Sequence, residues 1–112
     1  MVHNIKDWKL KLRYKKLETN FQHFTVFADG IVGQLTEGFE CRPGRAWMAM
    51  KVWATDTDEC VDMMRVIGTE IGFTIDGKTY VYKTEPDEPP CDNPSGYDIS
   101  FTPYDGGFRL IN

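Results

Sequence analysis

The stretch RAWMAMKVWATDTDECVDMMRVIGTEIG, residues 45–72, decides the fold of this chain. Residues 45–54 are predicted to form a strand, because they follow the period of two with which side chains alternate between the faces of a strand. After Arg45, both faces are apolar apart from Lys51, which is typical of a central strand. One face holds Met48, Met50, Val52 and Ala54, and the other holds Trp47, Ala49, Lys51 and Trp53.

A helix is predicted over residues 57–71, shortly after this strand. Asp56 can cap the free backbone amides, and Glu59, three residues later, completes a capping-box pattern. Gly72 suits the left-handed conformation in which many helices end. The apolar stripe recurs at helical spacing and comprises Cys60, Met63, Met64, Ile67 and Ile71.

This stripe must be buried, and its natural partner is the uncharged face of an antiparallel sheet. A chain of 112 residues has room for one core, so we predict a single α+β domain over residues 1–112. The one helix would pack on one face of a mostly antiparallel sheet that can curve strongly. About seven to eight short strands are expected, and those besides 45–54 cover residues 8–15, 21–28, 31–36, 73–75, 78–84, 96–102 and 108–111.

Two Asp-Gly pairs are predicted to be tight turns. Asp29-Gly30 would join strands 21–28 and 31–36, and Asp76-Gly77 would join strands 73–75 and 78–84. A two-residue hairpin turn needs positive φ angles, which Asp tolerates and Gly adopts freely. The intervening segments 37–44 and 85–95 are rich in glycine, proline and charged residues, so both are predicted to be loops.

The segment from Trp8 to Lys15 alternates apolar and cationic residues, which predicts a half-buried strand. A row of cations on an edge strand protects a sheet against edge-to-edge pairing, and we favour this interpretation over anion binding. The aromatic side chains Trp8 and Tyr14 would lie on the face opposite the cations, unlike those of a platform for single-stranded nucleic acid. The cations of this segment are Lys9, Lys11, Arg13 and Lys15.

The net charge of −4 is unevenly distributed. Residues 1–16 carry six cations against one carboxylate, a net charge of +5, and residues 54–112 carry four cations against twelve carboxylates, a net charge of −8. An acidic total argues against general nucleic-acid binding. The acidic segment would instead accelerate encounter with a basic partner, as in an inhibitor or immunity-type protein.

The pattern of reactive residues predicts no catalytic site, no metal site and no cofactor. His23 lies among strand aromatics and is interpreted as structural, although a pair between His23 and a cysteine stays open. The odd number of cysteines, Cys41, Cys60 and Cys91, and their separations of 19 and 31 residues match no zinc site. Without a secretory signal or a long apolar run, we expect a reduced, cytoplasmic protein that does not bind membranes.

The best candidate binding surface is the charged face of the strand 45–54. If the helix covers the opposite face, an aromatic surface remains that comprises Trp47, Lys51, Trp53, Tyr80 and Tyr82. Sheet curvature, a second subunit or a ligand must cover such a surface. We predict a non-catalytic binding module whose partner is a second copy in a homodimer or another protein, with a small-molecule ligand as a further option. The alternative is a small-molecule-binding protein or small enzyme with a pocket between sheet and helix.

Overall fold

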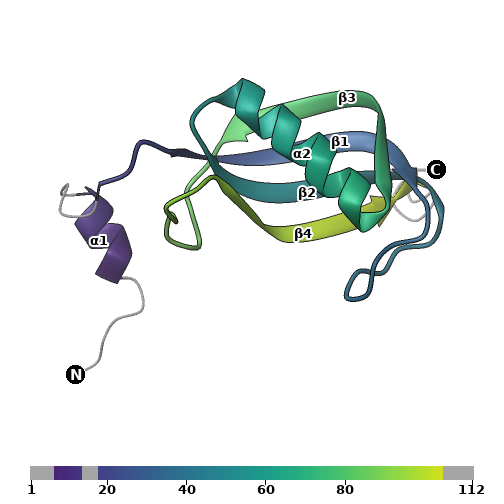
Figure 1. Cartoon of the computed structure of the whole chain (residues 1–112), viewed down its shortest axis with the longest axis horizontal. Helices are drawn as coiled ribbons and strands as arrows, with labels where there is room; N and C mark the ends of the chain where they lie inside the picture. Colours follow the sequence, from purple (N-terminus) through teal and green to yellow (C-terminus); the bar gives the residue numbers. More distant parts are fainter. Residues whose placement is uncertain (1–6, 14–17, 105–112) are drawn as a thin grey trace, which may run out of the picture.

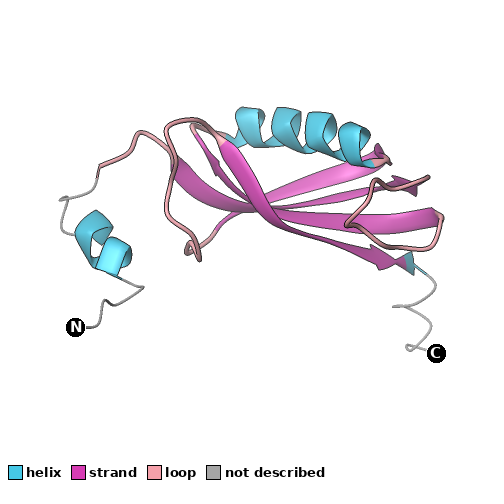
Figure 2. Cartoon of the chain, turned by 60° about the horizontal axis from the view of Figure 1, so that its bottom comes forward, coloured by secondary structure: helices cyan, strands magenta, loops and turns pink. Residues whose placement is uncertain are grey.

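Four strands form one antiparallel sheet, and a long helix lies across one of its faces (Figure 1). This computed structural model describes residues 7–13 and 18–104. Across the sheet the strand order is β3-β1-β2-β4, so β3 and β4 are the edges. Figure 2 shows α2 along one face of the sheet and α1 beyond its end. In chain order the elements are α1 (Asp7–Arg13), β1 (Gln22–Val32), β2 (Gly44–Ala54), α2 (Thr57–Ile71), β3 (Phe73–Lys83) and β4 (Ser95–Pro103).

The predicted central strand and helix are both present, and their apolar faces form the core. β2 lies between β1 and β4, as its two apolar faces indicate. Cys60 and Met64 of α2 are fully buried against the uncharged face of β2. The β2 residues that line this interface are also fully buried, and they are Met48, Met50, Val52 and Ala54. The α+β class and the antiparallel sheet are therefore confirmed.

The helix α2 begins and ends at the predicted residues. Asp56 Oδ1 accepts a hydrogen bond from the backbone N–H of Glu59 at 2.9 Å, which satisfies one of the free amides of the first turn. The Glu59 carboxylate reaches back and accepts from the backbone N–H of Thr55 at 2.7 Å. Gly72 has φ 119°, and its N–H donates to the carbonyl of Gly68 at 2.9 Å. The side chains of the cap therefore place the helix directly after β2.

The prediction of seven to eight short strands is wrong, because both Asp-Gly pairs lie inside strands. β1 continues through Asp29-Gly30 and β3 continues through Asp76-Gly77. The two pairs meet where the register between β1 and β3 shifts: Ala28 pairs with Thr79, but Gly30 pairs with Ile75. Asp29 alone therefore faces residues 76–78, which is a β-bulge. A glycine inside a strand pattern marks such a bulge as well as a turn.

Gly30 is required by a close approach of β3 to β1. A Cβ atom at this position would lie 2.3 Å from the carbonyl oxygen of Thr74 and 2.6 Å from the ring of Phe73. Phe73 is fully buried, so its ring has little room to move. The glycine thus lets residues 73–75 of β3, which precede the bulge, pack closely against β1.

The prediction of a strand over residues 8–15 is also wrong, because residues 7–13 form the helix α1. The chain therefore has a second helix besides α2. Lysine, leucine and arginine are good helix formers, so the alternating pattern of this segment fits a helix as well as a strand. Lys9 Nζ lies 5.7 Å from the centre of the Trp8 ring, a cation–π contact within α1.

Some predictions fall on residues outside the described ranges. Tyr14 and Lys15 lie there, as does the closing strand predicted over residues 108–111. Of the strand predicted over residues 31–36, only Ile31 and Val32 belong to a strand, at the end of β1. Neither α1 nor α2 is long and apolar enough to cross a membrane.

Replacement of Gly30 by alanine should destabilise the fold by about 1–3 kcal/mol, because the added methyl group collides with β3 backbone and a buried ring. Gly33→Ala is the matched control, since the nearest atom to a Cβ atom there lies at an ordinary contact distance of 3.5 Å. The free energy of unfolding of both variants can be measured by urea denaturation. Equal stability of the two variants would contradict the close approach at Gly30.

Candidate functional site

The face of the sheet opposite α2, here called the open face, carries the odd-numbered side chains of β1 and β2. The antiparallel register aligns Phe27 with Tyr80 and Thr25 with Tyr82. It also aligns Asp29 with Trp47 and His23 with Trp53. The structure therefore places all five predicted site residues on the open face: Trp47, Lys51, Trp53, Tyr80 and Tyr82.

Five rings form an aromatic patch on one half of the open face, in two contact groups that the register of β1 and β3 sets side by side. The Trp47 ring stacks on Tyr104 with a centroid separation of 6.2 Å and an interplanar angle of 9°. It also contacts Tyr80 at 6.0 Å. Phe27 meets Tyr82 edge-on at 5.9 Å. We call this group the aromatic patch, and its members are Phe27, Trp47, Tyr80, Tyr82 and Tyr104.

Polar contacts at the rim of the aromatic patch hold the Tyr104 ring in place. The Tyr104 hydroxyl donates to Asp29 Oδ1 at 2.7 Å, and this hydrogen bond raises the pKa of Tyr104. The Arg45 guanidinium lies 5.9 Å from the centre of the Tyr104 ring. Arg45 also donates to the Asp76 carboxylate at 3.2 Å. These contacts restrict the side-chain rotamers of Tyr104 and Arg45.

Trp53 belongs to the other half of the open face, which the chain itself covers. Its side chain is only 3% exposed, and its indole N–H donates to the carbonyl of Glu88 at 2.8 Å. Glu88 lies in the loop of residues 84–94, which joins β3 to β4. The His23 ring meets the Trp53 indole edge-on at 5.1 Å. Trp53 is thus positioned as a core residue under this loop, away from the exposed rings.

His23 is 5% exposed, and both of its ring nitrogens are hydrogen-bonded. Nδ1 lies 3.1 Å from the carbonyl oxygen of Thr84, which can only accept, so we assign the proton to Nδ1. Nε2 then accepts from the Tyr97 hydroxyl at 2.7 Å. The Tyr97 oxygen in turn accepts from the backbone N–H groups of Asp87 and Glu88, at 2.9 and 3.2 Å. This network requires a neutral imidazole, and burial lowers the pKa of His23 below its ordinary value of 6.5.

Lys51 lies at the border between the two halves and ties the loop to the sheet. Its ammonium group forms ion pairs with Asp87 and, at 2.9 Å, with Asp98. The hydrogen bonds to Asp87 and Asp98 raise the pKa of Lys51, and the bond from Lys51 lowers the pKa of Asp87. Asp98 has φ 54° and lies where β4 bulges opposite β2. Lys51 is therefore a structural clamp in this arrangement.

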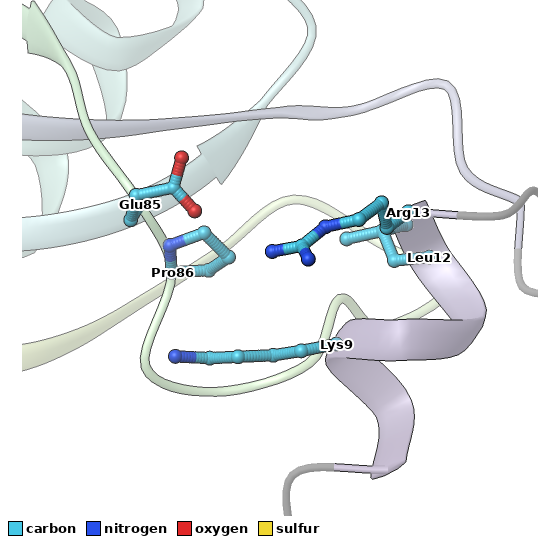
Figure 3. Close-up of a pocket in the computed structure, with 5 residues that line it drawn as sticks. All are labelled: Lys9, Leu12, Arg13, Glu85 and Pro86. Atoms are coloured by element: carbon cyan, nitrogen blue, oxygen red, sulfur yellow. The ribbon is translucent and has the colours of Figure 1, made fainter.

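The oppositely charged segments of the chain lie together at one end of the molecule. Figure 3 shows Lys9 and Arg13 of α1 beside Glu85 and Pro86, at the start of the loop 84–94. Together with Leu12 they line an open hollow of about 230 Å³. This volume is below the roughly 300 Å³ at which pockets for small molecules begin. The cations of α1 thus face the acidic loop, where they partly neutralise its charge.

The side chains that hydrogen-bond to the His23 ring are the hydroxyls of Thr84 and Tyr97, at 3.0 and 2.7 Å. Both nitrogens of this ring are already engaged, so neither is free to accept a proton from a substrate. Cys60 lies on the α2 side of the sheet, where burial raises the pKa of its thiol to about 11. Such a thiol stays protonated and unreactive at neutral pH. Neither His23 nor Cys60 is therefore positioned to act as a base or a nucleophile.

Two members of the aromatic patch were not predicted from the sequence. Phe27 shares the alternation of Thr25 and Asp29 along β1, and this pattern would have placed it opposite Val26 and Ala28. With a turn predicted at Asp29-Gly30, the pairing of Phe27 with Tyr80 could not be predicted. Tyr104 follows the last residue of β4 and joins the patch through tertiary contacts, among them those with Trp47 and Asp29.

Neither models of known protein families, nor curated protein sequences, nor solved structures match this chain.

The free energy of unfolding should decrease as the pH is lowered below about 6.5, and His23 should account for part of this decrease. A histidine with a lower pKa in the folded state binds more protons when unfolded, so its contribution is complete above about pH 6.5 and is lost as the pH falls toward the folded pKa. Asp87 and Glu85 face the ring and oppose this shift, whereas Lys51 supports it. Urea unfolding at a series of pH values from about 7.5 to about 5 measures the slope.

The matched control is His23→Gln, which keeps a polar side chain but cannot titrate. We expect a flatter pH profile for this variant than for the wild-type chain over the same range. Parallel profiles for the two proteins would show that His23 does not titrate differently on folding.

Proposed function

We propose that this protein is a non-catalytic interaction module that associates with a second copy of itself through the aromatic patch. The observation that carries the proposal is the exposure of three patch rings on one sheet face. Phe27 is 37% exposed, Tyr80 is 41% exposed and Tyr82 is 53% exposed. Tyrosine, tryptophan and phenylalanine are enriched in protein interfaces, because one rigid side chain buries a large area there.

Among the residues that the structure describes, the chain covers only the other half of the open face. The loop 84–94 buries Trp53 and His23 but leaves the patch rings on β1 and β3 exposed. The sheet among the described residues keeps two edges, so it does not curl into a closed barrel over these rings. A partner that covers the patch would remove this apolar surface from water, which is favourable at about 25 cal/mol per Å² before the costs of association.

The alternative of a ligand pocket between sheet and helix has no comparable support. Met48, Met50 and Met64 are fully buried at that interface and fill it with side chains. The proposal of an acidic inhibitor is also weaker. Lys9 and Arg13 face the acidic loop at Glu85, so a basic partner would have to compete with the chain's own cations.

Replacement of both Tyr80 and Tyr82 by serine should weaken the dimer by roughly tenfold or more, because two aromatic contacts are lost. Sedimentation over a range of protein concentrations gives the dissociation constant, and circular dichroism checks that the fold is kept. The matched control is Val66→Ser, which removes an equally exposed apolar side chain from α2 on the opposite face. A dissociation constant that falls or stays constant in the double variant would overturn the proposal.

A wild-type chain that remains monomeric at all concentrations would also overturn it. A shortened chain that ends at Tyr104 tests whether residues 105–112, instead of a second copy, occupy the patch. If residues 105–112 cover the patch, the shortened chain should dimerise while the full chain stays monomeric, and the patch would then be internal.

A further inference from the structure

The two edges of the sheet differ in their capacity to accept another strand. β4 is interrupted by the bulge at Asp98 and is bounded by Pro94 and Pro103, features that block edge pairing. β3 is bulged only at residues 76–78. Beyond the bulge, residues 79–83 pair one by one with Ala28 to Phe24 of β1 without a further shift. The segment 79–83 is therefore the regular part of the free edge.

The hydrogen-bond pattern shows which backbone groups of β3 face outward. The N–H of Thr84 donates to the carbonyl of His23 at 3.1 Å. Hydrogen-bonded and non-hydrogen-bonded pairs alternate along an antiparallel ladder, so Tyr82 and Tyr80 also bond to β1. The residues between and beside them turn their N–H and C=O groups toward the free edge: Thr79, Val81 and Lys83.

We propose that two copies of this chain join through antiparallel pairing of their β3 edges about a two-fold axis at Val81. In this register the whole segment 79–83 pairs with itself, and the outward groups of Thr79, Val81 and Lys83 are satisfied. A shift of the axis to Tyr80 would bring Gly77 of the bulge opposite Lys83. A shift to Tyr82 would bring Glu85 of the loop opposite Thr79.

The side chains are self-complementary in this register. Tyr80 of one copy faces Tyr82 of the other on the open face, and Val81 faces Val81 on the α2 side. Thr79 faces Lys83, so no like charges are directly opposed. Aromatic and β-branched cross-strand pairs stabilise antiparallel strands, and this segment consists largely of such residues. The pairing joins the two sheets into one and brings the two aromatic patches side by side.

This inference rests on the proposed self-association and gives it a geometry in which the two patches lie side by side and meet through Tyr80 and Tyr82. The alternative geometry is face-to-face contact of the two open faces. The two differ at Thr79, which lies on the α2 side of the sheet at the free edge, away from the open face. In edge pairing Thr79 meets the Lys83 side chain of the second copy, whereas in face-to-face contact it meets no partner.

The test places charges of either sign at this one position. Thr79→Lys should raise the dimer dissociation constant roughly 2- to 30-fold, because the two-fold axis creates two like-charge pairs with Lys83. Thr79→Glu should lower it by a similar factor, since the same pairs become attractive. Lys83→Glu combined with Thr79→Lys should restore dimerisation. Sedimentation at low ionic strength gives the dissociation constants, and Thr74→Lys, on the same strand before the bulge, is the control for added charge.

The outcomes separate this inference from the proposed function. Opposite effects of lysine and glutamate at position 79, with rescue by the charge exchange, would support edge pairing. Equal effects of the two substitutions, beside a dimer that the Tyr80 and Tyr82 variants disrupt, would overturn edge pairing but leave the patch as the interface. Charge effects at position 79 without any effect of the tyrosine variants would support edge pairing and overturn the role of the patch. A monomeric wild-type chain would overturn both.

Discussion

The packing of β2 against α2 is the constraint on which the rest of the structure depends. β2 has two apolar faces, but α2 can cover only one of them. The face with Met48, Met50 and Val52 takes the helix, because burial of the Lys51 ammonium under a helix would cost several kcal/mol. The remaining face, with Trp47, Lys51 and Trp53, is thereby directed away from the helix. The need for a second cover on the sheet follows from this one choice.

The two halves of the open face meet that need in different ways. On one half, the loop 84–94 shields Trp53 and His23, and their polar groups are satisfied by Thr84 and Glu88 of the loop and by Tyr97 of β4. The ion pairs of Lys51 fix the same loop. On the other half, the rings of the aromatic patch contact mainly one another, and their outer surfaces stay exposed. On the open face, the exposed rings of the described residues therefore lie on the half that the loop does not reach.

The meeting of two Asp-Gly pairs shapes the edge of the sheet as well as its centre. Instead of two hairpins, Asp29-Gly30 and Asp76-Gly77 form one bulge where two long strands pass each other. Gly30 permits the close approach on one side of the bulge, and the segment 79–83 continues undisturbed on the other. The same feature thus replaces several short strands by long ones and leaves a regular free edge on β3.

The sequence by itself determined the elements whose signals are local. Asp56, Glu59 and Gly72 define α2 through contacts within a few residues, and the alternation in β2 identifies both of its faces. Only the tertiary structure decided whether an Asp-Gly pair turns or bulges, because this depends on a facing strand about 45 residues away in the chain. It also decided which tryptophan is a core residue. Trp47 and Trp53 are equivalent in the sequence pattern, but the loop 84–94 folds over Trp53 alone. Local propensity could not distinguish helix from strand at residues 8–13. An alternation of lysine and leucine is compatible with both, and only the tertiary structure shows that this segment is helical.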